Sequence, residues 1–220
     1  RRAEPDDRLV TTLAWVCAAL TAGFALTDWW AVVAERQRVR YVAKPATLVA
    51  LIGVAVALDP ADPRVRTWMV LGLVLSLAGD VFLMLEERFF IAGLVAFLLG
   101  HIAYVVGLQL APTSVGGTVL GLALVALCVA TVGQRVVRGV AAGDHKELVG
   151  PVIAYLAVIS AMVISACGTG DPRAIVGATL FYASDATLAW NRFLEPRRWG
   201  PLAVMVTYHL GQAGLVAWLA

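Results

Sequence analysis

Charged side chains are scarce in this chain. Of 220 residues, 15% are charged and 60% are hydrophobic, and the mean hydropathy is +0.83. A soluble domain has about a quarter charged residues and about half apolar ones, so the composition predicts an integral membrane protein. The net charge of +2 and the lack of a long basic tract exclude a nucleic-acid partner.

Cysteine and histidine are also rare. Cys17, Cys128 and Cys167 stand in apolar runs without CxxC spacing, which excludes a disulfide framework and a zinc knuckle. The three histidines lie in different segments and no HExxH motif occurs. His145, in the polar stretch "GDHKE", is expected to be solvated. The sequence therefore predicts neither a metal site nor a cofactor.

Long apolar runs make up most of the chain. Eight are long enough, or nearly so, to cross a bilayer at about 20 residues each. No cleavable signal is evident. We predict an all-α, polytopic membrane protein in which residues 1–220 form one integral membrane domain, with a short polar tail at residues 1–8. The predicted transmembrane helices span residues 9–34, 42–58, 67–85, 89–110, 113–133, 148–167, 174–194 and 200–220.

The basic residues of the connectors predict an orientation. Eleven Lys and Arg lie at one end of the predicted helices, among them Arg36 and Arg197, and six lie at the other. By the positive-inside rule the first end is cytoplasmic, with both termini outside. We expect the membrane to be the bacterial plasma membrane.

Proline, aspartate and histidine recur at similar intervals in the two halves. Pro45, which the hydropathy places at the start of the second helix, is followed by Asp80 and His101; Pro151 is followed by Asp185 and His209. "GDVFL" and "SDATL" share the Asp and a Leu three positions later. These intervals predict a 4+4 parallel repeat, and the competing interpretation is chance.

Several polar residues lie inside the predicted helices at similar depth. At about 1.5 Å per residue, Asp80 lies about 9 Å and Asp185 about 10 Å from the arginine-rich end. Two acids at one depth, with few cations nearby in the sequence, are hard to explain as scaffold. We predict that they share a cavity with the other polar residues that enter from this end, Asp28, Lys44, His101 and His209.

Some of these residues also have structural interpretations. Asp28 and Lys44 are candidates for an ion pair near the interface, and Lys44 alone for snorkelling. Asn191 and Arg192, at a helix end, are placed to meet phosphate headgroups. Tyr104 and Tyr182 share helical faces with His101 and Asp185, respectively, and are candidates for interhelical hydrogen bonds.

Two buried carboxyl groups at one site predict acid–base chemistry. Burial and a neighbouring carboxylate both disfavour ionisation, so one acid of a close pair can stay protonated near neutral pH. A protonated acid beside an ionised one is suited to hydrolysis by general acid–base catalysis.

Five separated motifs resemble the YhhN-type lysoplasmalogenase family. They are "KP", "GDVFL", "FLLGHIAY", "FYASDATLAWNRF" and "TYHLGQ", between about residues 41 and 215. The resemblance implies an eight-helix membrane enzyme that hydrolyses the vinyl ether bond of lysoplasmalogens. It also implies Asp80 and Asp185 as the catalytic pair, a fatty aldehyde and glycerophosphocholine or glycerophosphoethanolamine as products, and no protein partner.

Further residues are assigned around this implied lysophospholipid site. His101, Tyr104, Tyr182, Ser184 and His209 are candidates to hold the water and adjust the acids, and Lys44 and Arg192 are candidates to meet the phosphate. The full substrate-binding set is Asp28, Lys44, His101, Tyr104, Tyr182, Ser184, Asn191, Arg192, Tyr208 and His209. The alternatives are a proton-coupled transporter, with the two acids as a proton relay, and a zinc-dependent membrane lipid hydrolase.

Overall fold

The computed structural model describes the backbone of residues 5–144 and 146–220, and the side chains from residue 12 on within these ranges. The predictions that concern His145 and the side chains of Arg1, Arg2 and Arg8, which are among the six basic residues counted at the second end, therefore lie outside the described residues. Over the described ranges the secondary structure is helical, without strands. This confirms the predicted all-α class.

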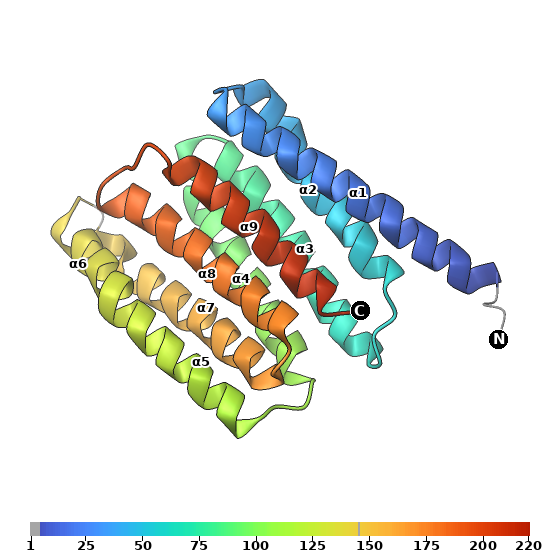
Figure 1. Cartoon of the computed structure of the whole chain (residues 1–220). Helices are drawn as coiled ribbons and strands as arrows, with labels where there is room; N and C mark the ends of the chain where they lie inside the picture. Colours follow the sequence, from blue (N-terminus) through green and yellow to red (C-terminus); the bar gives the residue numbers. More distant parts are fainter. Residues whose placement is uncertain (1–4, 145) are drawn as a thin grey trace. The chain divides into compact units, whose positions relative to one another are not determined.

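Eight helical rods cover the described part of the chain (Figure 1). Seven are single α-helices. The fifth rod is continuous from α5 through the π-helical turn η2 into α6. The bounds are α1 Pro5–Val33, α2 Gln37–Ala57, α3 Pro63–Met84, α4 Phe90–Gln109, α5 Val115–Cys128, η2 Val129–Gly133, α6 Gln134–Ala142, α7 Val149–Thr169, α8 Pro172–Phe193 and α9 Gly200–Ala217. Two short 3₁₀ turns, η1 Glu87–Phe89 and η3 Lys146–Leu148, precede α4 and α7.

Some predicted boundaries are wrong. The second helix begins at Gln37, so Pro45 lies inside α2 instead of starting it. The fifth rod continues to Ala142 because the segment after Gly133 is an amphipathic helix, where hydropathy alone indicated a loop. The tail predicted over residues 1–8 is already helical from Pro5.

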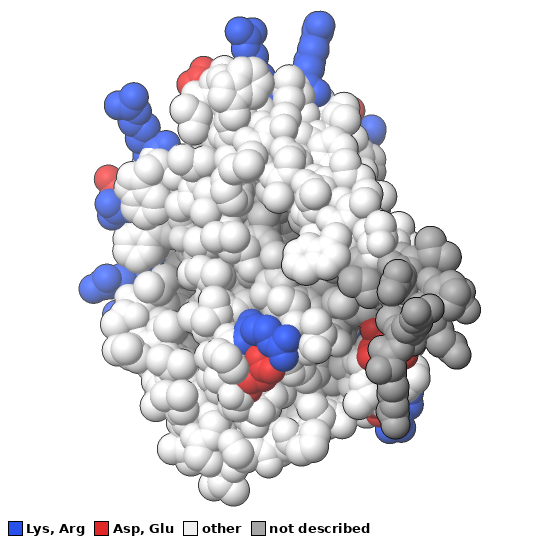
Figure 2. All heavy atoms as spheres, turned by 45° about the vertical axis from the view of Figure 1, so that its right-hand side comes forward, with Lys and Arg blue, Asp and Glu red and all other residues white. Residues whose placement is uncertain are grey.

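Six rods are long and apolar enough to cross a membrane: Thr12–Val33, Gln37–Ala57, Pro63–Met84, Glu87–Gln109, Val115–Ala142 and Lys146–Thr169. This confirms an integral membrane protein. The helices α8 and α9 carry the polar side chains of Asp185, Arg192, His209 and Gln212, which lower their hydropathy. That these two helices also span the bilayer stays a prediction. Charged side chains are few on the face drawn in Figure 2.

The chain divides into two compact units, Arg1–Leu110 with Leu215–Ala220, and Ala111–Gly214. The first, unit 1, holds α1 to α4. The second, unit 2, holds α5 to α8 and α9 up to Gly214. The boundary between the fourth and fifth rods agrees with the helix count of the predicted 4+4 repeat. The repeat itself, and a single bundle over residues 1–220, stay predictions.

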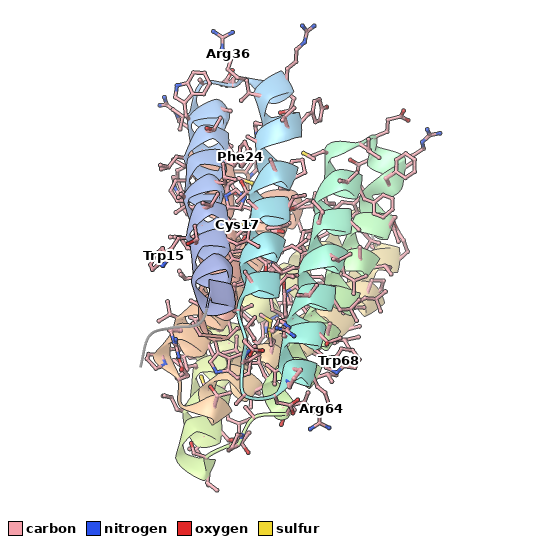
Figure 3. All side chains as sticks on the ribbon, turned by 90° about the vertical axis from the view of Figure 1, so that its right-hand side faces the viewer. Trp15, Cys17, Phe24, Arg36, Arg64 and Trp68 are labelled. Atoms are coloured by element: carbon pink, nitrogen blue, oxygen red, sulfur yellow. The ribbon has the colours of Figure 1, made fainter. Side chains whose placement is uncertain are left out.

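In unit 1 each helix packs against the next along the chain. A tight turn with Glu35 at φ 56° joins α1 to α2. The two helices run side by side, with Cys17 between them, whereas Trp15 points away from α2 (Figure 3). Arg36 and Arg64 mark opposite ends of α2–α3 in the same view.

Glycines at seven-residue intervals bring α3 and α4 close together. Gly72 lies against the ring of Tyr104, and a Cβ at Gly79 would lie 2.5 Å from the ring of Phe97. Small residues on a membrane helix allow this close approach and the van der Waals packing that holds such helices together. The register places Asp80 on α3 one residue beyond Gly79.

In unit 2, α7 packs against both α5 and α8. The helix α9 also crosses α8 closely, because a Cβ at Gly211 would lie 2.8 Å from the amide nitrogen of Phe181. Asp171 begins α8 by accepting a hydrogen bond from the backbone N–H of Arg173 at 2.8 Å, with Pro172 at the first helical position. These contacts fix the α8 segment that carries Asp185.

Candidate active site

A cluster of four charged side chains occupies the interior of unit 1. The ammonium nitrogen of Lys44 lies 2.8 Å from Oδ1 of Asp80, with side chains 7% and 1% exposed. Nε of Arg40 lies 3.6 Å from Oδ1 of Asp28, which is completely buried. Lys44 and Asp80 also act electrostatically on Asp28, so the two pairs form one network.

Local structure explains how this charged cluster forms. Arg40 and Lys44 are four residues apart on α2 and therefore share a helical face. The turn at Glu35 returns the chain so that this face meets Asp28 near the end of α1, and α3 brings Asp80 to the same side. Two cations and two carboxylates compensate one another, as buried charges require.

The structure corrects three sequence interpretations of this region. Lys44 does not snorkel; it is buried and paired with Asp80. The ion-pair partner that the structure gives Asp28 is Arg40, and not Lys44 as predicted. The expectation that few cations neutralise the acids is wrong for Asp80. Arg40 was missed because hydropathy placed it in a loop, whereas α2 begins at Gln37 and makes it a helical residue.

His101 and Tyr104 lie on α4 and are both buried. Nδ1 of His101 donates a hydrogen bond to the carbonyl oxygen of Phe97, one turn earlier, at 2.7 Å. This bond fixes the tautomer and leaves the proton-accepting nitrogen at Nε2. Tyr104 packs its ring on Gly72 of α3, and the interhelical hydrogen bond predicted for it stays a prediction.

Asp185 makes a short hydrogen bond in unit 2. The hydroxyl of Tyr155 on α7 donates to Oδ2 of Asp185 on α8 at 2.5 Å. Tyr155 was not among the predicted site residues. The same depth estimate identifies it: Tyr155 lies seven residues into the predicted helix 148–167, about 10 Å deep, which is the depth of Asp185.

Four other predicted residues lie in the interior on α8 and α9: Tyr182, Ser184, Tyr208 and His209. The Ser184 hydroxyl donates to the carbonyl oxygen of Val204 at 3.0 Å and thus joins α8 to α9. Tyr208 packs edge-on against Phe181, with ring centroids 5.2 Å apart. Tyr182 and His209 are buried.

At the end of α8, the neighbouring residues Asn191 and Arg192 have different surroundings. The side-chain oxygen of Asn191 accepts the backbone N–H of Arg197 at 3.0 Å. This hydrogen bond closes the turn into α9. Asn191 therefore has a structural role, which differs from the predicted contact with phosphate. Arg192 is exposed, as a residue that meets headgroups should be.

Each acid has a partner within its own unit. The ammonium of Lys44 pairs with Asp80, and the hydroxyl of Tyr155 donates a hydrogen bond to Asp185. Within the described side chains, no group of three or more His, Cys, Asp or Glu is arranged to hold a metal ion. The meeting of Asp80 and Asp185 in one cavity stays a prediction.

Residues 39–219 match the model of the YhhN family. The chain belongs to this family. It is 35% identical over 158 residues to a lysoplasmalogenase of Mycobacterium bovis, an alignment that covers 68% of this chain and 58% of that protein. It is 30% identical over 151 residues to the lysoplasmalogenase TMEM86B of Mus musculus, covering 68% of this chain and 62% of the relative.

The chain thus spans less than two thirds of the length of these curated relatives. A similar match, 31% identity over 140 residues, is found with TMEM86B of Homo sapiens. No solved structure matches the chain significantly.

Proposed function

We propose that this protein is a membrane lysoplasmalogenase that hydrolyses the vinyl ether bond of lysoplasmalogens. The observation that carries the proposal is its membership of the YhhN family together with 30–35% identity to relatives named lysoplasmalogenase. The membrane-spanning helices agree with a lipid substrate, whose chain would lie among the apolar helices. The products would be a fatty aldehyde and glycerophosphocholine or glycerophosphoethanolamine.

The reaction requires an acid that protonates carbon. Proton transfer to the alkene carbon of the vinyl ether gives an oxocarbenium ion. Water adds to this cation and loses a proton, and the resulting hemiacetal collapses to the aldehyde and the alcohol. One carboxyl group supplies the first proton, while an ionised carboxylate stabilises the cation and orients the water.

The contacts of the two acids support an assignment of these tasks. We assign Asp80 as the ionised partner, because the ammonium of Lys44 balances its negative charge. We assign Asp185 as the acid, because the hydroxyl of Tyr155 donates a hydrogen bond to its Oδ2 and can hold the carboxyl group in one orientation for proton transfer. Both assignments require the two carboxyl groups to reach one substrate.

The test is incubation of the purified full chain with three matched lysolipids that carry a vinyl ether, an alkyl ether or an ester. Mass spectrometry then measures fatty aldehyde. We expect aldehyde from the vinyl ether lipid alone, and an equal rate after treatment with a chelator. Absence of aldehyde from the vinyl ether lipid would refute the proposal. Loss of activity on chelation, restored by zinc, would favour the zinc-dependent alternative, and proton-coupled uptake without any product would favour the transporter.

A further inference from the structure

An open pocket of about 550 Å³ lies in unit 2 between α6 and the end of α8. Its lining consists of Arg135, Arg138, Gly139, Trp190, Leu194 and Glu195. The volume is within the range of small-molecule sites. None of these residues belongs to the acid site proposed above.

The charge of the pocket is predominantly positive. Arg135 and Arg138 are three residues apart and share one face of α6. Neither makes a salt bridge within the part of the chain that the structure describes; Arg138 donates a hydrogen bond to the side-chain oxygen of Gln134 at 3.2 Å. The acid of the pocket, Glu195, already lies 3.8 Å from Arg197. Two arginine charges are therefore left for a ligand.

Trp190 adds a hydrogen-bond donor. Its indole N–H is buried and has no acceptor among the described residues. Such a donor destabilises the protein if it stays unsatisfied. The guanidinium carbon of Arg197 lies 5.6 Å from the ring centroid, over the indole face. The pocket thus offers guanidinium and indole donors to a group that carries several acceptor oxygens and a negative charge.

We propose that this pocket binds the phosphate headgroup of an anionic bilayer phospholipid. Guanidinium groups bind phosphate oxygens with charge-assisted, often bidentate hydrogen bonds. Basic pockets between transmembrane helices, at the arginine-rich end of a bundle, are suited to anionic lipid headgroups. Leu194 supplies an apolar contact for the glycerol and the start of the acyl chains.

The geometry of α8 places the phosphate of the bilayer lipid and the phosphate of the lysolipid substrate on different faces of the helix. Trp190 lies five residues after Asp185, which corresponds to about 7.5 Å along α8 and about 140° around it. Arg192, seven residues after Asp185, returns to within about 20° of the same face. The substrate phosphate therefore belongs on the side of Arg192, and the lipid in the pocket is a second molecule.

The test measures lipid binding and is independent of hydrolysis. The detergent-solubilised full chain is titrated with phosphatidylglycerol, phosphatidylcholine or inorganic phosphate, and the apparent Kd is obtained from the shift of the melting temperature. We expect phosphatidylglycerol to stabilise the protein most strongly. Arg135→Gln and Arg138→Gln should each weaken its binding about tenfold, and Trp190→Phe, which keeps an aromatic ring but removes the indole N–H, about fivefold.

Arg88→Gln is the control, because Arg88 is likewise an exposed arginine but lies outside the pocket, where it pairs with Glu86 at 3.1 Å. If Arg88→Gln weakened phosphatidylglycerol binding as much as the pocket variants, any arginine at the membrane interface would contribute equally, and the proposal would be overturned. Equal stabilisation by inorganic phosphate would overturn the assignment to a lipid. A raised KM for the lysolipid with unchanged binding of phosphatidylglycerol would assign the pocket to the substrate instead.

Discussion

Removal of one hydroxyl tests how Asp185 is held. In Tyr155→Phe the ring stays, and the 2.5 Å hydrogen bond to Oδ2 of Asp185 is lost. As Asp185 gives up its proton the carboxyl group becomes charged, and a hydrogen bond to a charged group contributes about 1.5–3 kcal/mol. At about 1.4 kcal/mol per factor of ten, we expect kcat for aldehyde release to fall about tenfold to about a hundredfold.

The assay must distinguish a positioning residue from a purely structural one. We expect Tyr155→Phe to lower kcat with little change in KM and to alter the shape of the pH profile of kcat, because the hydroxyl acts on the carboxyl group that transfers the proton. Loss of folded protein would instead lower the rate by the same factor at every pH. Tyr41→Phe, an exposed tyrosine on α2, is the control. A Tyr155→Phe enzyme within twofold of the wild type, with the same pH profile, would refute this account of Asp185.

Two further predictions concern stability in detergent. Lys44→Met leaves the buried Asp80 carboxylate without its cation, so we expect a loss of about 3–5 kcal/mol and a large fall in the melting temperature. The double variant Lys44→Met/Asp80→Asn should regain most of that loss, and a double variant as unstable as the single one would contradict the ion-pair interpretation. The hydrogen bond from the Arg173 side chain lowers the pKa of Asp171 below 3.8. The ionised Asp171 carboxylate therefore stabilises the fold above the unfolded pKa, and this stabilisation is lost as pH falls through the folded pKa. Asp171→Ala should therefore cost about 1 kcal/mol at neutral pH and nothing below the folded pKa, and an equal cost at both pH values would contradict this.

Hydropathy predicts the number of helices well, because each long apolar run becomes one rod. Hydropathy does not predict where the helices begin and end. An amphipathic segment such as Gln134–Ala142 has low mean hydropathy although it is helical, and Pro45 is tolerated within α2. Proline is often accepted inside membrane helices, so it does not reliably mark a start.

The candidate site was predictable as a set of acids, and its hydrogen-bond partners were not. Asp80 and Asp185 stand out because carboxyl groups are costly at bilayer depth. Tyr155 lies at the depth of Asp185, but depth alone does not show that the two side chains meet, since a tyrosine in an apolar run usually packs. Its role depends on α7 lying beside α8, which a single sequence does not specify. Arg40 was hidden by the misplaced start of α2.

The central claim is that Asp80 and Asp185 act as one unit in aldehyde release. The most direct test measures kcat for a vinyl ether lysolipid in Asp80→Asn, Asp185→Asn and the double variant, with the melting temperature as the check of folding. Loss of a positioned acid or its charged partner costs about a hundredfold to about ten-thousandfold. We predict losses of this size per folded enzyme in both single variants, with a lower melting temperature for Asp80→Asn because it leaves the buried Lys44 without its carboxylate. We also predict a double variant little worse than either, and a His145→Ala control near the wild type. Multiplied losses in the double variant, or a folded Asp185→Asn with near-normal aldehyde release, would contradict the claim.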